Sequence, residues 1–269
     1  MKRLTISFIS ALLLVVLAAC GSGNESSEGS SDSASLYDEI KEKGVLTVGT
    51  EGTYPPYTFH GENDELTGYD VEVTREVAKR LDLEVEFNET KWDSMFAGLN
   101  TERFDMIANQ VGIKPDRKEK YDFSTPYTYT SAVLVVGKDN TSINTFEDLE
   151  GKKAAQSLTS NYGDIAKEYG ADIVGVEGFN PAMQLIETGR AEATVNDRLS
   201  VLDFLNQKGE GVKAKIVDRQ EDASENAFAF RKGNEELVEA VNGALEEMKE
   251  DGTLAEISNK WFGEDVSSK

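Results

Sequence analysis

Residues 69–108 read YDVEVTREVAKRLDLEVEFNETKWDSMFAGLNTERFDMIA, and their pattern predicts a helix, a strand, a helix and a strand in turn. Apolar side chains recur at every fourth residue from Val73 to Leu81, which is the spacing of the buried face of a helix. We place this first helix at 69–83, with Asp70 as a candidate N-terminal cap.

Apolar periodicity also predicts the remaining strands and helices of this stretch and of the rest of the chain. Residues 83–87 (LEVEF) alternate apolar and polar side chains, as a half-buried strand does. Residues 92–99 carry an i, i+3, i+4, i+7 apolar stripe, which predicts a second helix, and residues 104–108 form a buried strand. The alternation continues along the chain, with strands predicted at 45–50, 132–136, 153–156, 173–176, 193–195 and 228–230, and helices at 162–169, 181–188, 198–206, 237–250 and 254–261. Such alternation predicts an α/β architecture with largely parallel sheets.

The N-terminus has the layout of a secretion signal. Two basic residues precede an apolar run at 6–19, which is shorter than the roughly 20 residues that a transmembrane helix needs. The small residues at the end of the run are followed by Cys20, an arrangement that resembles the bacterial lipoprotein signal, in which this thiol is acylated. We therefore expect a signal peptide at 1–19, a lipid anchor at Cys20 and a flexible linker at 20–35, which has no large apolar side chain. The alternative is a plain secretory signal with a chance cysteine.

Composition excludes several functions. The formal net charge of −22 argues against nucleic acid as a partner, because nucleic-acid binding needs clustered lysine and arginine. Cys20 and His60 are the single cysteine and the single histidine, and no G-x-S-x-G nucleophile motif is present. We expect no metal, no cofactor and no catalytic residue.

The order of segments resembles one family over almost the whole chain after the linker. This family comprises the extracytoplasmic solute-binding proteins of ABC importers for polar amino acids (solute-binding protein family 3). The matching segments are GVLTVGTEGTYPPYTF (44–59), LTGYDVEVTREVAKRL (66–81), WDSMFAGLNTERFDMIANQVGIKPDR (92–117), YDFSTPY (121–127), GKKAAQSLTSNYG (151–163), ETGRAEATVND (187–197) and MKEDGTLAEISNKWFG (248–263). Residues 44–59, 91–100 and 154–163 are most similar to the L-cystine-binding lipoproteins of Gram-positive bacteria.

The resemblance implies a periplasmic-binding-protein-like fold of type II, with two α/β lobes, a two-strand hinge and a ligand in the cleft. Lobe 1 would comprise 36–131 and 227–269, and lobe 2 would comprise 132–226, with the hinge strands starting near Ser131 and ending near Ala227. It further implies a monomer on the extracellular face of the membrane that delivers an amino acid to the permease subunits of an ABC importer.

A free amino acid is a zwitterion, so its cleft needs donors for a carboxylate and an anion for an ammonium group. Arg117 ends the segment that matches the family's carboxylate-binding motif, and its planar guanidinium suits a carboxylate. The alternative is a surface arginine paired with Asp116 or Glu119. The resemblance also implies a backbone N–H donor at Thr159, and the alternative there is an ordinary helix cap. Its neighbours Ser157 and Ser160 complete this polar turn.

For the ammonium group, the resemblance implies Asp197, which follows an apolar strand. The alternative is an N-cap for the helix that begins at Arg198, and the two roles are compatible. Asn109 and the carbonyl group of Gln110 are expected helpers. The family often has serine at the position of Gly112, so one hydroxyl donor is missing here.

Side-chain recognition is expected on the loop after the first strand, at Glu51, Tyr54, Tyr57 and Phe59. Packing is the alternative, above all for Phe59, and Trp92 is expected in the core, although the family permits it at the cleft edge. We predict L-cystine as the ligand, because sulfur packs well on aromatic edges. Glutamine, arginine and histidine are alternatives. So are a sensor lipoprotein and a dehydratase on the same fold with Glu51 as its acid or base.

Overall fold

The computed structural model describes residues 34–222 and 224–269. The predicted signal peptide at 1–19, the lipidation site Cys20 and the linker up to residue 33 lie outside the described residues. Within the described part of the chain, no helix is long and apolar enough to cross a membrane.

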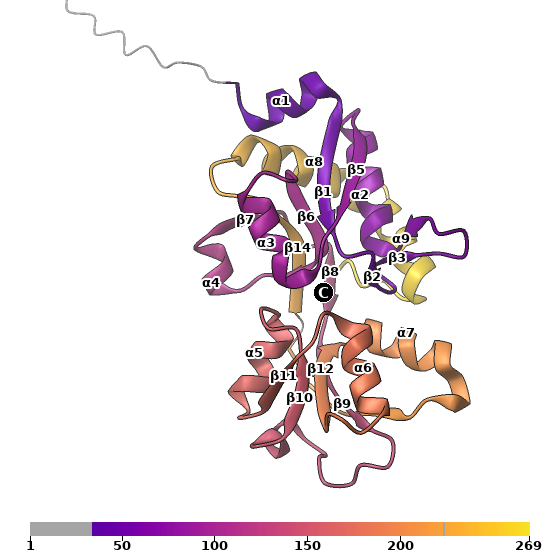
Figure 1. Cartoon of the computed structure of the whole chain (residues 1–269). Coiled ribbons are helices and arrows are strands. Elements are labelled where there is room, and N and C mark those ends of the chain that lie inside the picture. The colour runs from indigo at the N-terminus through magenta and orange to yellow at the C-terminus, as the bar shows by residue number, and fades with distance from the viewer. Residues whose placement is uncertain (1–33, 223) are drawn as a thin grey trace, which may run out of the picture. The chain divides into compact units, whose positions relative to one another are not determined.

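Helices and strands alternate along most of the described chain (Figure 1). The helices are α1 (Leu36–Lys43), α2 (Tyr69–Arg80), α3 (Trp92–Asn100), α4 (Pro115–Lys118), α5 (Asn161–Glu168), α6 (Phe179–Glu187), α7 (Arg198–Lys208), α8 (Glu235–Glu250) and α9 (Thr253–Phe262), with 3-10 turns η1 (Phe146–Leu149) and η2 (Gly209–Gly211). The strands are β1 (Val45–Thr50), β2 (Thr53–Tyr54), β3 (Thr58–His60), β4 (Leu66–Thr67), β5 (Glu84–Glu89), β6 (Met106–Gly112), β7 (Tyr121–Phe123), β8 (Thr128–Thr130), β9 (Ala132–Gly137), β10 (Lys153–Gln156), β11 (Asp172–Gly175), β12 (Ala193–Asp197), β13 (Ala214–Arg219) and β14 (Ser224–Arg231).

The first lobe is built on a six-stranded sheet in the order β5-β1-β6-β14-β7, with β8 paired to β14. Successive side chains of a strand point to opposite faces of the sheet, and β6 shows this clearly. Met106 joins the core formed with α2, α8 and α9, whereas Ile107 joins Met95 and Leu99 of α3 on the opposite face. A small sheet of β2, β3 and β4 lies between β1 and α2 in the sequence.

The second lobe is built on a five-stranded sheet in the order β11-β10-β12-β9-β13. Leu134 and Val195 pack on one face with Tyr162 of α5, and Val135 packs on the other face with Met183 of α6. Figure 1 accordingly shows α5 on one side of this sheet and α6 and α7 on the other. The chain therefore forms two α/β lobes, as predicted.

The sheets are mixed rather than largely parallel. β1 runs parallel to β5 and β6, and β10 runs parallel to β11 and β12, but β9 and β14 are antiparallel to every strand that they contact. These two strands lie next to the points at which the chain crosses between the sheets, so they are not part of the helix-connected parallel units. Local periodicity does not report strand direction, which is why the prediction missed this.

The first crossing falls at Ser131, between β8 and β9, where the hinge was predicted. The second crossing follows Arg219, the end of β13, and precedes Ser224, the start of β14, so it comes before the predicted position near Ala227. Ser224 already pairs with Thr130 in the first sheet, so residues 224–226 do not extend the second lobe. The apolar residues at 228–230 lie in the buried part of β14, which begins four residues earlier, at Ser224, so the apolar pattern did not indicate the start of the strand.

Asp70 does not cap α2, contrary to the prediction. The N-cap is Gly68 at φ 127°, where a Cβ atom would lie 2.2 Å from the carbonyl oxygen of Tyr57. Close backbone approach therefore requires glycine at this position and moves Asp70 into the first turn of the helix.

Candidate functional site

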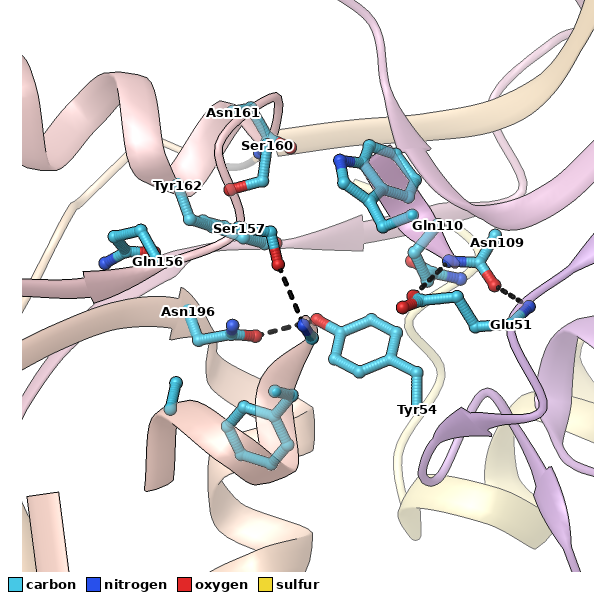
Figure 2. A pocket seen from close by; sticks show the side chains of 14 residues that line it. Glu51, Tyr54, Asn109, Gln110, Gln156, Ser157, Ser160, Asn161, Tyr162 and Asn196 are labelled. Atoms are coloured by element: carbon cyan, nitrogen blue, oxygen red, sulfur yellow. Dashed lines mark hydrogen bonds between the residues drawn. The ribbon is translucent and has the colours of Figure 1, made fainter. Parts of the chain in front are cut away.

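A cavity of about 40 Å³ lies between the two lobes (Figure 2). Glu51, which directly follows β1, and residues of β2, α3 and β6 face residues of the second lobe across it. The lining residues are Glu51, Tyr54, Trp92, Asn109, Gln110, Gln156, Ser157, Ser160, Asn161, Tyr162, Gly178, Phe179, Ala182 and Asn196.

Glu51 places a carboxylate in this cavity. Its Oε2 atom accepts a hydrogen bond of 2.8 Å from Asn109 Nδ2, and its backbone N–H donates to Asn109 Oδ1 at 2.7 Å, as Figure 2 shows. Burial raises the pKa of Glu51 to about 6, while the bond from Asn109 opposes this shift. Glu51 is therefore an anion at neutral pH that loses its charge in mildly acidic solution.

Asp70 holds the backbone at Gln110. Its carboxylate accepts bonds from Gln110 N (2.8 Å) and Gln110 Nε2 (2.6 Å), and burial raises its pKa to about 7. Gln110 has a φ of 50°, a left-handed conformation that is uncommon outside glycine. Between Ile107 and Val111, β6 advances four residues while β14 advances two, so a bulge carries Asn109 and Gln110 toward the cavity.

Arg117 is a buried cation beside the cavity. Its Nη1 donates to the carbonyl oxygen of Gly112 (2.9 Å), and its Nη2 donates across the lobes to the carbonyl oxygen of Thr159 (3.2 Å). The guanidinium carbon lies 5.3 Å from the ring centres of both Trp92 and Phe96. Burial lowers the pKa of Arg117, yet an arginine stays charged at any physiological pH. The side chain is only 5 % exposed, so the alternative of a surface arginine is wrong.

The loop at 157–160 faces the first lobe. Ser157 Oγ accepts from the Gly178 N–H (3.2 Å), and Ser160 Oγ caps α5 by accepting from the Gly163 N–H (2.9 Å). The N–H of Thr159, predicted to receive a ligand carboxylate, donates instead to Asp93 Oδ1 of α3 at 3.0 Å.

Asp197 lies behind the cavity rather than on it. Its Oδ1 accepts from Tyr57 Oη (2.8 Å) and from the backbone N–H groups of Leu199 (2.8 Å) and Ser200 (3.1 Å), and its Oδ2 accepts from Tyr162 Oη (3.2 Å). It is therefore the N-cap of α7, which was the structural alternative for this residue. Burial raises its pKa, and the hydrogen bonds that it accepts oppose that shift.

The predicted aromatic residues separate into two groups. Tyr54 lines the cavity, and its hydroxyl donates to Asn196 Oδ1 at 2.8 Å (Figure 2). Tyr57 is fully buried and does not line the cavity. Phe59 packs edge-on against Trp261 with ring centres 5.9 Å apart, so it is a packing residue in this arrangement.

Half of the predicted ligand-binding residues line the cavity, namely Glu51, Tyr54, Asn109, Gln110, Ser157 and Ser160. The others, which do not line it, are Tyr57, Phe59, Gly112, Arg117, Thr159 and Asp197. The analysis of the sequence missed Gln156, Asn161, Tyr162, Gly178, Phe179, Ala182 and Asn196, and placed Trp92 in the core by default. Asn161 and Asn196 each adjoin a predicted site residue, which was the available signal, whereas the start of α6 carried none.

The family model of bacterial extracellular solute-binding proteins, family 3, matches residues 46–264. The L-cystine-binding protein TcyA of Bacillus subtilis is 54 % identical over 269 residues, which cover 99 % of this chain and 100 % of that protein.

Two solved structures are also similar. The L-cystine solute receptor of Neisseria gonorrhoeae in the unliganded open conformation is 48 % identical, with a TM-score of 0.58 over 88 % of this chain and 100 % of that chain. An ancestral arginine-binding protein bound to arginine is 38 % identical, with a TM-score of 0.77 over 82 % of this chain and 99 % of that chain. The gonococcal receptor, although more similar in sequence, superposes less well than the ancestral protein.

Proposed function

The chain belongs to the bacterial extracellular solute-binding proteins of family 3, and on this premise we propose that it captures L-cystine for an ABC importer. The relatives named above are binding proteins rather than enzymes, so the cavity is a place for capture and not for turnover. The protein works as a monomer that closes on its ligand and docks on the permease subunits.

The observation that carries the proposal is a buried anion on the cavity lining, Glu51, with a buried cation beside the cavity, Arg117, which packs against the lining residue Trp92. Arg117 has five N–H donors, of which the structure shows two bonded to carbonyl oxygens. Glu51, which directly follows β1, supplies the opposite charge on the first-lobe side of the cavity. A zwitterion matches this pair, because its carboxylate and its ammonium group each find an oppositely charged partner.

Unpaired polar atoms on the lining strengthen the argument for a polar ligand. Trp92 Nε1, Gln110 Oε1 and Gln156 Nε2 are buried and have no hydrogen-bond partner among the described residues. A buried polar atom without a hydrogen-bond partner destabilises a protein by about 1–3 kcal/mol. A ligand that bonds to such an atom removes this penalty, which favours binding.

Cystine is favoured over a smaller amino acid by the aromatic lining and by the relatives. Tyr54, Trp92 and Phe179 offer faces and edges that suit a disulfide. TcyA and the gonococcal receptor are both named for L-cystine. Arginine remains the second candidate, because the ancestral structure holds it and Glu51 would accept its guanidinium.

The cavity of about 40 Å³ has room for a few water molecules. An amino acid the size of cystine therefore enters only when the lobes separate around the two crossings, at Ser131 and between β13 and β14. Closure then follows as a population shift, since a ligand that bridges both lobes favours the closed state.

Calorimetric titration of the purified protein with L-cystine, L-arginine, L-glutamine and L-histidine tests the proposal. We expect the tightest binding for cystine. Tight arginine or glutamine binding without a response to cystine would refute the ligand assignment and leave the transport assignment intact.

The charge of Glu51 predicts a pH dependence of ligand affinity. The ligand's ammonium group favours the ionised carboxylate, so binding lowers the pKa of Glu51 from about 6 and releases a proton at acidic pH. We expect the Kd for cystine to be nearly constant from pH 7.5 to 6.5 and to rise about tenfold per pH unit below 6.

Glu51→Gln removes the titrating group, so we expect weaker binding at pH 7 and no such rise in Kd. Glu168→Gln is the matched control, because Glu168 is an exposed acid of the second lobe at the end of α5 and does not line the cavity. An unchanged pH profile in Glu51→Gln would show that Glu51 does not contact the ligand's cation.

We further propose that Cys20 is acylated after cleavage of residues 1–19 and tethers the protein to the outer face of the membrane. The support is the apolar run that ends in Leu-Ala-Ala-Cys at 17–20. Cys20→Ser should release the protein into the medium or leave it unprocessed, as measured by fractionation and intact mass. Unchanged membrane retention with unchanged mass would contradict the anchor.

A further inference from the structure

Asp93 bridges the two lobes through its carboxylate. It lies in the first turn of α3, and its Oδ1 accepts from Thr159 N (3.0 Å) and Thr159 Oγ1 (2.7 Å). Its Oδ2 lies 3.4 Å from Leu158 N. Three donors of the second lobe thus converge on one carboxylate of the first lobe, from 65 and 66 residues away in the sequence.

These donors are the ones that a bound amino acid needs. The carbonyl oxygen of Thr159 accepts a hydrogen bond from Arg117 Nη2, and the N–H of the same residue donates to Asp93. The backbone N–H of Thr159 therefore lies close to the Arg117 guanidinium. A backbone N–H carries a single hydrogen, so it cannot serve Asp93 and a ligand carboxylate at full strength together. Asp93 and the ligand therefore compete for Thr159.

We propose that Asp93 is an internal competitor for the ligand's carboxylate, which closes the cleft in the absence of an amino acid and weakens the apparent affinity. The inference rests on the proposed function, because it takes the ligand carboxylate to bind at Arg117 and Thr159. When the Asp93 bridge forms, the binding-competent fraction of the protein falls, and the apparent Kd rises by the inverse of that fraction.

A second contact between the lobes provides the comparison. Lys114 Nζ of the first lobe donates to Asp164 Oδ2 of the second lobe at 2.6 Å, away from the cavity lining. Asp164 lies in the first turn of α5, as Asp93 does in α3, and both side chains are exposed. The Lys114–Asp164 pair leaves the N–H of Thr159 free, so it is compatible with a bound ligand.

The two contacts therefore predict opposite effects on affinity. Removal of Asp93 destabilises only the ligand-free closed state, so affinity rises. Removal of Asp164 destabilises the ligand-free and the ligand-bound closed states alike, so affinity stays equal or falls.

The experiment compares wild type, Asp93→Ala and Asp164→Ala by calorimetric titration with L-cystine and by small-angle X-ray scattering without it. We expect Asp93→Ala to lower the Kd by about 3- to 10-fold, as for loss of one charge-assisted contact at a partly solvated site. We expect Asp164→Ala to leave the Kd unchanged or raise it. Without ligand, Asp93→Ala should show a larger radius of gyration than wild type.

A Kd for Asp93→Ala that is unchanged or higher would overturn the proposal, because Asp93 would then keep its contact when the ligand binds or never form it. An unchanged radius of gyration in Asp93→Ala would overturn the bridge itself. If none of the three proteins binds cystine but wild type binds another amino acid, the same comparison is made with that amino acid. If wild type binds no amino acid, the proposed function fails, and the scattering comparison still decides whether Asp93 holds the lobes together.

Discussion

Arg117→Ala is expected to weaken cystine binding by about 2–5 kcal/mol, which is roughly 30-fold to several thousand-fold in Kd. Arg117 is 5 % exposed and covered by Trp92 and Phe96, so its interactions with an anion are little screened by water. Its bonds to the carbonyl oxygens of Gly112 and Thr159 leave N–H donors for a carboxylate. The substitution removes the charge and the bridge to the second lobe together.

Arg117→Lys separates these two contributions, because lysine keeps the charge and lacks the planar fork. We expect an intermediate Kd for this variant. Arg198→Ala is the control, since Arg198 also pairs across the chain, with Glu264 at 2.7 Å, and does not line the cavity. The Kd of each variant is measured by calorimetric titration after its circular dichroism spectrum has been shown to match that of wild type. Wild-type affinity in Arg117→Ala would refute the assignment of the carboxylate site.

Asp197→Ala is expected to lower the free energy of unfolding of the ligand-free protein by about 3–5 kcal/mol. The side chain is fully buried, and its removal leaves the Tyr57 hydroxyl and the N–H groups of Leu199 and Ser200 without their acceptor. Loss of an N-cap alone costs about 0.5–2 kcal/mol, and the stranded hydroxyl groups add to that.

Tyr57→Phe is the matched variant, because it removes one of these bonds and keeps the cap. We expect it to cost about 1 kcal/mol. Urea unfolding without ligand measures both variants. A residue that served only the ligand would leave the ligand-free stability unchanged, so equal midpoints for wild type and Asp197→Ala would show that the buried network contributes nothing.

The sequence alone determined most of the local elements and the family. It did not predict α1, α4, β13 or the short strands β2, β3, β4, β7 and β8. Periodicity predicted the bounds of α2, α3 and α8 to within a few residues. A helix buries one face, and the apolar residues of that face recur every three to four positions in the local sequence. The ordered segments from 44 to 263 identified the two-lobed fold. Glu51 and Asn109 were predicted as site residues from the resemblance to the family, and both line the cavity.

The tertiary structure alone decided which partner each polar group meets. Asp70 was predicted as a cap and instead bonds to Gln110. Asp197 is the N-cap of α7, one of the two compatible roles predicted for it. Asp93 gave no signal in the sequence, since its partner Thr159 lies 66 residues away on the other lobe. Periodicity reports which face of an element is buried, but a carboxylate bonds to whichever donors the folded chain brings within about 3 Å, and only the packing of distant segments determines those.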